Sequence, residues 1–369
     1  MKKILFFIPS LGNGGAEKVL VNLANNLDKS KFDVTVQVLF DGGENTQFLN
    51  SDVKYKYVFK RIIRGNVKLL KLFSPERLYK WFVKEKYDIA VAYLEGVASR
   101  IISGCNDKNT KTVSWIHIEQ HTMENLATAF RNASEAEKCY NSFDNVICVS
   151  EYVQKDFTDI LNFKKHTEVL YNTNETDQIV EKSKEKAPIK TDDDYINICG
   201  IGTLCPRKGF HKLARIHKKL LDEGIKQRVY ILGQGNYKSQ LEAIIKENNI
   251  EDTFILLGYD TNPYKYLNAC DLFVCSSEAE GFSTVVTESL IVGTPVVTTR
   301  CSGMEEQLGY NNEYGIVTDN NEQALYEGIK EMLTKEGCLE YYADKALERG
   351  KSFNKSITVK AVEDMLEKL

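Results

Sequence analysis

Short apolar runs alternate with amphipathic helical patterns along almost the whole chain, and this alternation is the feature that most constrains the fold. It is typical of parallel β-α-β units, in which each apolar run forms a buried strand. The runs fall at residues 3–9, 34–40, 88–94, 112–117, 146–150, 168–172, 195–200, 228–233, 253–258, 272–277, 296–299 and 315–319. The pattern therefore predicts an α/β fold with parallel sheets.

The alternation lapses between residues 173 and 194, which are mostly polar and charged. A chain of 369 residues is long for one core, and at roughly 150 residues per domain it should form two. We expect Rossmann-like domains at 1–172 and 195–350, joined by a linker at 173–194. A C-terminal helix at 351–369 is expected to pack back toward the N-terminal domain.

The stretch SSEAEGFSTVVTE joins an expected strand to an expected helix, and it contains Glu280 and Glu288. Ser283 or Thr284 is a suitable N-cap, so the amides that follow, including that of Val285, favour an anion such as a phosphate. A carboxylate near a phosphate suits sugar hydroxyls, which donate hydrogen bonds and carry no charge. Phosphate and sugar together indicate a nucleotide sugar.

Two further loops follow expected strands and contain glycines. The loop after the first strand holds Gly14 and Gly15, which would allow a ligand to approach the backbone closely. The first loop of the second half runs from Gly202 to Arg207 and Lys208. These two cations could neutralise a diphosphate, or they could be solvated surface residues.

Few residues could bind a metal ion or take part in an acid–base step. His117 ends an expected strand, but His121 is equally available, and a single histidine is more often structural. The aspartates at 192–194 have the Asp-x-Asp spacing of some metal-dependent sugar transferases, although solvation of a linker explains them. The nine cysteines include no CxxC pair, which indicates a reducing compartment. We expect a cytoplasmic protein without a metal.

Residues 60–86 carry nine Lys and Arg against Glu76 and Glu85, interleaved with apolar and aromatic side chains. Such a mixture can lie on an anionic membrane, with charges at the headgroups and aromatic rings in the interface. It fits equally a solvated helix pair whose apolar side packs on its own domain. The two expectations for this stretch are therefore peripheral contact with the inner face of the membrane and a solvated helix pair. We expect no nucleic-acid partner.

The carboxylates Glu280 and Glu288, with the setting Glu-Gly-Phe, resemble the Glu-x7-Glu motif of retaining glycosyltransferases of family 4. Other matching segments fall in the expected order, at residues 14–17, 149–150, 172, 208–209, 232–235 and 293–297. The whole chain is similar to that family, and its second half is the more specific part. The resemblance implies a GT-B architecture, which has two facing Rossmann-like domains with a ligand cleft between them.

The resemblance also implies roles for individual residues. Glu280 and His117 would contact the donor sugar, and Lys208 would neutralise the leaving diphosphate. The other donor contacts would come from Glu288 at the ribose, Tyr259 at the base, and Gly14, Gly15, Gly202, Phe282, Ser283, Thr284 and Val285 at the sugar and diphosphate. The family usually has an arginine where this chain has Thr203. Either Arg207 replaces its charge, or the diphosphate relies more on the N-terminus of the expected helix.

The resemblance implies transfer of a hexosyl or N-acetylhexosaminyl group from a nucleotide sugar, expected to be UDP-linked, with no other cofactor. The acceptor would be a glycan or lipid-linked oligosaccharide in surface polysaccharide synthesis, such as that of a capsule. The alternatives are an epimerase or hydrolase of nucleotide sugars, a non-catalytic binding partner, and an NAD-dependent oxidoreductase. The last is disfavoured because Glu17 takes the place of the third glycine of the dinucleotide fingerprint.

Overall fold

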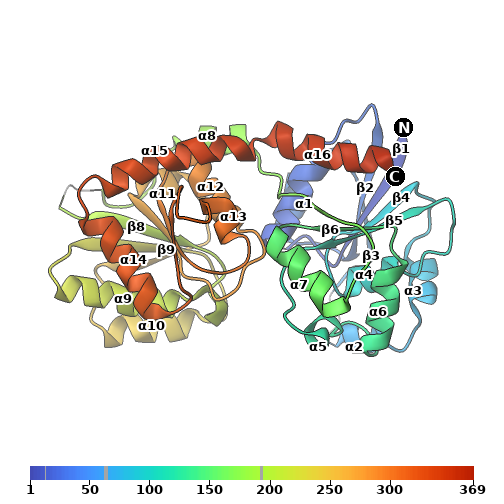
Figure 1. Cartoon of the computed structure of the whole chain (residues 1–369), viewed down its shortest axis with the longest axis horizontal. Coiled ribbons are helices and arrows are strands. Elements are labelled where there is room, and N and C mark those ends of the chain that lie inside the picture. The colour runs from blue at the N-terminus through green and yellow to red at the C-terminus, as the bar shows by residue number, and fades with distance from the viewer. Residues whose placement is uncertain (13, 62–64, 192–193) are drawn as a thin grey trace. The chain divides into compact units, whose positions relative to one another are not determined.

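The computed structural model describes residues 1–12, 14–61, 65–191 and 194–369. The chain forms two compact units (Figure 1). Unit 1 comprises Met1–Asn174 together with Lys355–Leu369, and unit 2 comprises Glu175–Asn354. Each unit contains one parallel sheet with helices on both of its faces, which is the doubly wound arrangement expected from the alternating pattern.

Unit 1 has a seven-stranded sheet in the order β3-β2-β1-β4-β5-β6-β7. Its strands are β1 (Lys2–Ile8), β2 (Phe32–Phe40), β3 (Lys54–Phe59), β4 (Ile89–Ala92), β5 (Lys111–Ile116), β6 (Asn145–Cys148) and β7 (Thr167–Val169). Its helices are α1 (Gly15–Asn26), α2 (Asn66–Leu70), α3 (Pro75–Phe82), α4 (Val97–Ile102), α5 (Met123–Leu126), α6 (Ala133–Ser142), α7 (Glu151–Leu161) and α16 (Lys355–Lys368), with the 3-10 turn η1 (Glu44–Phe48).

Unit 2 has a six-stranded sheet in the order β10-β9-β8-β11-β12-β13. Its strands are β8 (Ile196–Ile201), β9 (Gln227–Leu232), β10 (Phe254–Gly258), β11 (Leu272–Cys275), β12 (Val296–Thr299) and β13 (Ile316–Thr318). Its helices are α8 (Thr176–Ser183), α9 (Phe210–Asp222), α10 (Lys238–Glu247), α11 (Tyr264–Ala269), α12 (Thr284–Val292), α13 (Met304–Leu308), α14 (Glu322–Thr334) and α15 (Cys338–Gly350), with the 3-10 turns η2 (Pro206–Lys208) and η3 (Lys351–Phe353).

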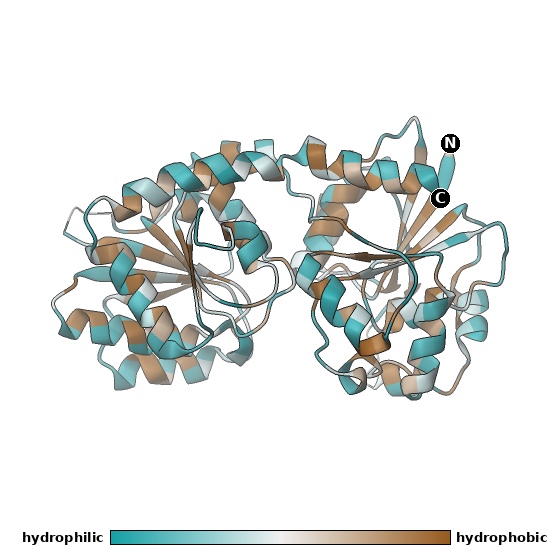
Figure 2. Ribbon diagram, in the orientation of Figure 1, coloured by the Kyte–Doolittle hydropathy of each residue, from teal (hydrophilic) through white to brown (hydrophobic). Residues whose placement is uncertain are grey.

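The strands form the core of each unit, as Figure 2 shows by their brown colour between helices of mixed colour. Central strands of parallel sheets are covered on both faces, so they are apolar throughout rather than alternating. In β1, for example, Ile4–Ile8 is entirely buried. This burial fixes the central strands and thereby the loops that follow their carboxyl ends.

Two elements differ from the sequence expectations. The strand β3 was not expected, because its residues alternate in type and it lies at the edge of the sheet, where one side is exposed. The segment at 173–194, expected to be a linker, contains α8 and belongs to unit 2. Ile179 packs with Tyr264 and Ile291, and Ala187 packs with Leu232. Two of the three aspartates at 192–194 lie outside the described residues.

The C-terminal helix α16 packs on unit 1. Lys2 Nζ donates a hydrogen bond to the carbonyl oxygen of Leu366 at 3.0 Å, and the amide of Asp28 donates to Glu363 Oε1 at 2.7 Å. The chain therefore passes from unit 1 to unit 2 and returns. Among the described helices, each is too short or too polar to cross a bilayer.

Candidate functional site

The site of unit 2 lies where the order of its strands reverses. β8 and β11 are central neighbours, and the chain leaves them toward opposite edges of the sheet. In open parallel sheets ligands bind outside the carboxyl ends of the strands at such a point. The loop after β8 carries Lys208, and the loop after β11 carries Glu280. The structure therefore brings these two predicted residues together.

Lys208 and Glu280 form an ion pair with 2.6 Å between Nζ and Oε1. Ser277 Oγ donates a second hydrogen bond to the same Oε1 atom, also at 2.6 Å. Both charged side chains are largely buried, with 16% of Lys208 and 11% of Glu280 exposed. A buried pair of this kind is stable only while both partners are present, because either charge alone would be left without compensation.

The Lys208 ammonium keeps its charge despite its burial. Burial acts to lower the pKa of Lys208, but the adjacent Glu280 carboxylate acts in the opposite direction, and the pKa lies above its usual value. Lys208 is thus a permanent cation at physiological pH. A cation with this position could neutralise an anionic ligand group at the ends of β8 and β11.

Close backbone packing holds the loop that carries Lys208. Gly209 has φ +67°, and a Cβ atom at this position would lie 1.9 Å from the carbonyl oxygen of Ser276. Ser276 Oγ also donates to the carbonyl oxygen of Lys208 at 2.8 Å. A Cβ at Gly202 would lie 3.0 Å from Lys208 Cε. The glycines therefore provide space for the lysine chain and for contact between the two loops.

Helix α12 begins beside this pair, with Ser283 as its N-cap. Ser283 Oγ accepts a hydrogen bond from the amide of Val286 at 3.4 Å, which confirms the predicted cap. Gln307 accepts from the amide of Ser283 at 3.2 Å, so this amide is already paired within the protein. The amides of Thr284 and Val285 lie in the first turn of α12. Amides of a first turn have no carbonyl acceptor within their own helix.

The other residues of unit 2 that were predicted to contact the donor differ in how exposed they are. Arg207 is exposed, and its Nη1 donates to the carbonyl oxygen of Ala279 at 2.7 Å, so it contacts the loop that carries Glu280. Thr203 is exposed, and Tyr259 is 47% exposed just beyond β10. Glu288 lies in the second turn of α12 and is only 1% exposed. Phe282 is buried.

Unit 1 places its predicted residues at the corresponding strand ends. Gly14 and Gly15 follow β1 at the start of α1, and His117 follows β5. His117 is 9% exposed, and its ring centroid lies 4.8 Å from that of Tyr93. Burial lowers the pKa of His117 to about 3, so the imidazole is neutral. Its amide donates to Glu95 Oε2 at 2.9 Å.

The chain is similar to known glycosyltransferases over its whole length. Residues 13–178 match the family described as Glycosyltransferase Family 4, and residues 181–349 match glycosyl transferases group 1. A curated relative from Campylobacter jejuni is 30% identical, with 100% of both chains covered. The chain belongs to glycosyltransferase family 4. The relative is named N-acetylgalactosamine-N,N'-diacetylbacillosaminyl-diphospho-undecaprenol 4-alpha-N-acetylgalactosaminyltransferase.

Another curated relative and two solved structures are also similar to this glycosyltransferase. The lipopolysaccharide core biosynthesis glycosyltransferase LpsE of Rhizobium meliloti is 23% identical, with 83% of this chain and 82% of LpsE covered. The crystal structure of Anabaena HepE with UDP and glucose has a TM-score of 0.80 at 19% identity, with 100% of both chains covered. Sucrose-phosphate synthase of Thermosynechococcus elongatus also gives 0.80, at 14% identity, covering 100% of this chain and 99% of that one. The likeness confirms the GT-B fold.

The family assignment settles the choice among the classes of function that the sequence left open. The chain is a glycosyltransferase, and specifically a hexosyltransferase, so the epimerase, oxidoreductase and non-catalytic alternatives are set aside. The roles of individual residues stay predictions.

Within the described parts of this glycosyltransferase, one group of three residues lies close enough to hold a metal ion. The ligand atoms of Glu119, His121 and Asp156 lie within 4.8 Å of one another. Asp156 already accepts hydrogen bonds from the amides of Gln120 at 2.7 Å and of His121 at 3.1 Å. Through these hydrogen bonds Asp156 anchors the loop after β5, and this anchoring explains why the three side chains lie close together.

Sequence reasoning missed several residues that shape both sites. Ser277 is one of two adjacent serines, and only the structure shows that its hydroxyl reaches Glu280. Gln307 comes from α13, and its contacts with Ser283 and Thr287 join segments far apart in sequence. Glu95 lies three residues beyond the end of β4, so the rule that ligands bind after the strands could have identified it.

Proposed function

We propose that this glycosyltransferase moves a hexosyl or N-acetylhexosaminyl group from a UDP-sugar to a glycan or lipid-linked acceptor, with retention of configuration and without a metal. The observation that carries the proposal is the Lys208–Glu280 pair beside the N-terminus of α12. The names of relatives in lipid-linked and lipopolysaccharide synthesis support a role in surface polysaccharide assembly. HepE, which was crystallised with UDP-glucose, supports the donor class.

The charges of the site match those that develop during glycosyl transfer. Breaking the bond between the anomeric carbon and the diphosphate places negative charge on the leaving oxygen. Lys208 and the amides of Thr284 and Val285 are preorganised to stabilise that charge. The acceptor oxygen then bonds to the anomeric carbon on the face from which the diphosphate departs, while the leaving phosphate takes the proton of the acceptor hydroxyl. Because the new bond forms on the face of the old one, the configuration is retained.

Binding of the donor exchanges the partners of the ion pair. The diphosphate takes over Lys208, and Glu280 is released to accept hydrogen bonds from hydroxyls of the donor sugar. Glu288 serves the ribose, Tyr259 borders the base, and Arg207 supports the loop of Glu280. In unit 1, the neutral imidazole of His117 contacts the sugar near the reacting carbon, and Gly14 and Gly15 let their loop approach the substrate.

Transfer should not require a metal ion, because Lys208 and the helix amides supply the positive charge at the leaving group. We expect activity with UDP-sugars to persist after exhaustive treatment with EDTA, measured as UDP release in the presence of acceptor. Adding magnesium or manganese to the treated protein is the control. Loss of activity with EDTA and its recovery with metal would contradict the proposal and would direct attention to Glu119, His121 and Asp156.

We further propose that the acceptor is presented at an anionic membrane surface, and that α2 and α3 make the contact. Leu69, Leu72 and Trp81 are 51%, 69% and 44% exposed. The buried Arg100 donates to the carbonyl oxygens of Leu70 and Phe73 at 3.0 and 2.7 Å. The turn between the helices is thus held firmly, with the side chain of Leu72 outward. Arg64, one of the nine basic residues of this stretch, lies outside the described part.

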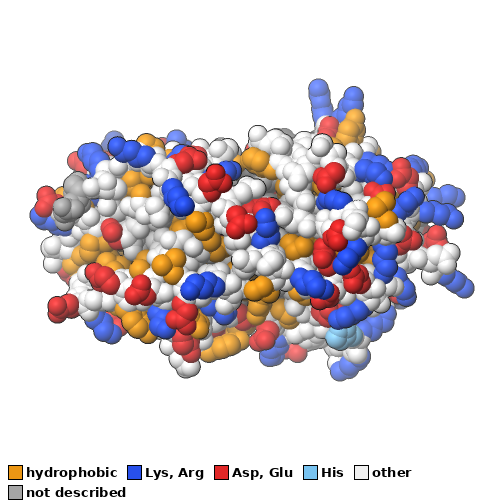
Figure 3. Space-filling view, turned by 90° about the horizontal axis from the view of Figure 1, so that it is seen from above, with side chains coloured by type: hydrophobic (Ala, Val, Ile, Leu, Met, Phe, Trp, Pro, Cys, Tyr) orange, Lys and Arg blue, Asp and Glu red, His pale blue; other side chains and the backbone are white. Residues whose placement is uncertain are grey.

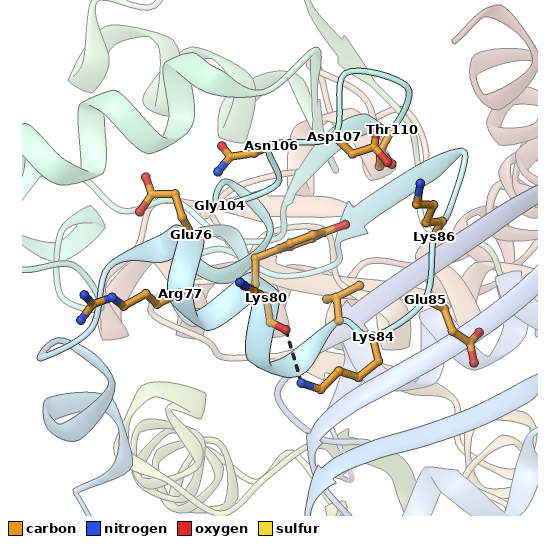
Figure 4. Close-up of a pocket in the computed structure, with 12 residues that line it drawn as sticks. Glu76, Arg77, Lys80, Lys84, Glu85, Lys86, Gly104, Asn106, Asp107 and Thr110 are labelled. Atoms are coloured by element: carbon orange, nitrogen blue, oxygen red, sulfur yellow. Dashed lines mark hydrogen bonds between the residues drawn. The ribbon is translucent and has the colours of Figure 1, made fainter.

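Exposed cations lie on α3 and in the segment that follows it. Arg77, Lys80, Lys84 and Lys86 are exposed and line a shallow cavity of about 520 Å³ between α3 and residues 104–110 (Figure 4). Glu76, Glu85 and Asp107 also line it, so the excess of positive charge is small. On the face shown in Figure 3, cationic and anionic side chains are interspersed. The membrane proposal therefore depends on the combination of charge with exposed apolar side chains.

Membrane binding can be measured by sedimentation with vesicles. We expect the protein to bind vesicles of phosphatidylglycerol and phosphatidylcholine more strongly than phosphatidylcholine alone. The double variant Arg77→Gln/Lys80→Gln should weaken binding by about 2 kcal/mol, or roughly thirtyfold, since each cation contributes about 1 kcal/mol. Trp81→Ser should weaken it for both vesicles. Ile357→Ser, which removes a 56% exposed side chain from α16, is the control. Equal sedimentation of all variants would exclude α2 and α3.

A further inference from the structure

Two carboxylates lie where the order of strands reverses in unit 1. β1 and β4 are neighbours there, and the chain leaves them toward opposite edges. Glu17 lies in the first turn of α1, which follows β1, and Glu95 lies three residues beyond the end of β4. Neither forms an ion pair with any residue that the structure describes. This position corresponds to that of Lys208 and Glu280 in unit 2.

The two carboxylates are close enough to interact. The side chain of Glu17 folds back over the glycine loop, since a Cβ at Gly14 would lie 2.2 Å from Glu17 Oε2. Burial raises the pKa of both groups, and the charge of Glu17 contributes to the raised pKa of Glu95. Two partly buried carboxylates without a cation disfavour a diphosphate, because like charges repel strongly away from water.

The surroundings favour a neutral ligand with hydroxyl groups. Glu95 uses Oε2 to accept the amide hydrogen of His117 at 2.9 Å. His117 Nε2 is buried and makes no hydrogen bond to the described residues. A buried polar atom without a partner is unusual, and a neutral imidazole can exchange a hydrogen bond with a hydroxyl. Carboxylates and a neutral imidazole together match a sugar better than a phosphate.

We propose that Glu95 and Glu17 bind hydroxyl groups of the acceptor sugar, beside His117. This inference rests on the proposed function, in which the hydroxyls of the donor already have Glu280 and Glu288 in unit 2. It makes the two carboxylates residues that determine acceptor specificity.

The test uses the full-length protein saturated with UDP and a panel of methyl α-glycosides of glucose, galactose, N-acetylglucosamine and N-acetylgalactosamine. Saturation-transfer NMR should detect at least one of them on the wild-type protein. Glu95→Gln and Glu17→Gln should each weaken that binding about tenfold, as expected for a lost charge-assisted hydrogen bond. Glu137→Gln, at an exposed position of α6, should bind as the wild type does.

Titration calorimetry with UDP separates this inference from the function on which it rests. The two carboxylate variants should bind UDP within about twofold of the wild type, because the diphosphate is held elsewhere. Weaker UDP binding by these variants, unchanged glycoside binding, or no saturation transfer to the wild type would overturn the inference. If the wild type failed to bind UDP at all, the proposed donor would be wrong instead. Glu17→Gln decides the matter if Glu95→Gln does not fold.

Discussion

Replacing Lys208 by methionine should lower the rate of glycosyl transfer by about a hundredfold to a thousandfold. Loss of one preorganised group that stabilises a developing oxyanion typically has an effect of this size. Lys208 is the cation that the fold holds at the carboxyl ends of β8 and β11, and its partner Glu280 keeps it charged. The measurement is the initial rate of UDP release with donor and acceptor both saturating.

Two variants show whether such a loss is specific. Lys212→Met removes a neighbouring cation that pairs with Glu278 at 2.8 Å and is 17% exposed, close to the 16% of Lys208. Its activity should stay close to that of the wild type. Lys208→Met leaves Glu280 without its cation and should destabilise the fold by about 3 kcal/mol. Lys208→Met/Glu280→Gln should recover stability but not activity, and recovered activity would remove Lys208 from catalysis.

Glu280→Gln should lower turnover by about tenfold to a hundredfold while changing UDP affinity little. The amide keeps the shape of the carboxylate but loses the charge that strengthens hydrogen bonds to sugar hydroxyls, each worth about 1.5–3 kcal/mol. Because UDP lacks the transferred sugar, calorimetry with UDP should not detect this loss. The comparison of kcat with UDP affinity therefore assigns Glu280 to the sugar rather than to the nucleotide.

The control for this variant is Glu278→Gln, two residues earlier in the same loop. Glu278 is half exposed and pairs with Lys212, so its charge contributes little to the site. Glu288→Gln should show the opposite pattern, with weakened UDP binding. If Glu280→Gln and Glu278→Gln had the same kinetics, the assignment of Glu280 to the donor sugar would fail.

The predictions from sequence succeeded where a local physical rule was sufficient. The apolar runs at 195–200 and 272–277 predicted β8 and β11, because a strand buried on both faces needs continuous apolar sequence. Ser283 or Thr284 was expected to cap α12, since a hydroxyl before an apolar helix satisfies its first amides, and the structure has Ser283 as the cap. The placing of Lys208 and Glu280 in loops that follow two of the expected strands came from the same reasoning.

What sequence could not predict depends on contacts between distant segments. The register of β8 and β11 brings Lys208 against Glu280, although they are 72 residues apart, and nothing in the local sequence encodes this. The segment of α8 looked like a linker because most of its residues are polar. Its few apolar side chains hold it to unit 2 by packing against α11 and α12, which the local sequence does not show. Arg207 resembled a free cation until its contact with Ala279 was seen.

The most direct test of the central claim is a crystal structure of the protein with UDP bound. The account predicts that the diphosphate lies within hydrogen-bonding distance of Lys208 Nζ and of the amides of Thr284 and Val285, with the Lys208–Glu280 pair opened. UDP bound away from the carboxyl ends of β8 and β11, or bound there with that pair intact, would contradict it.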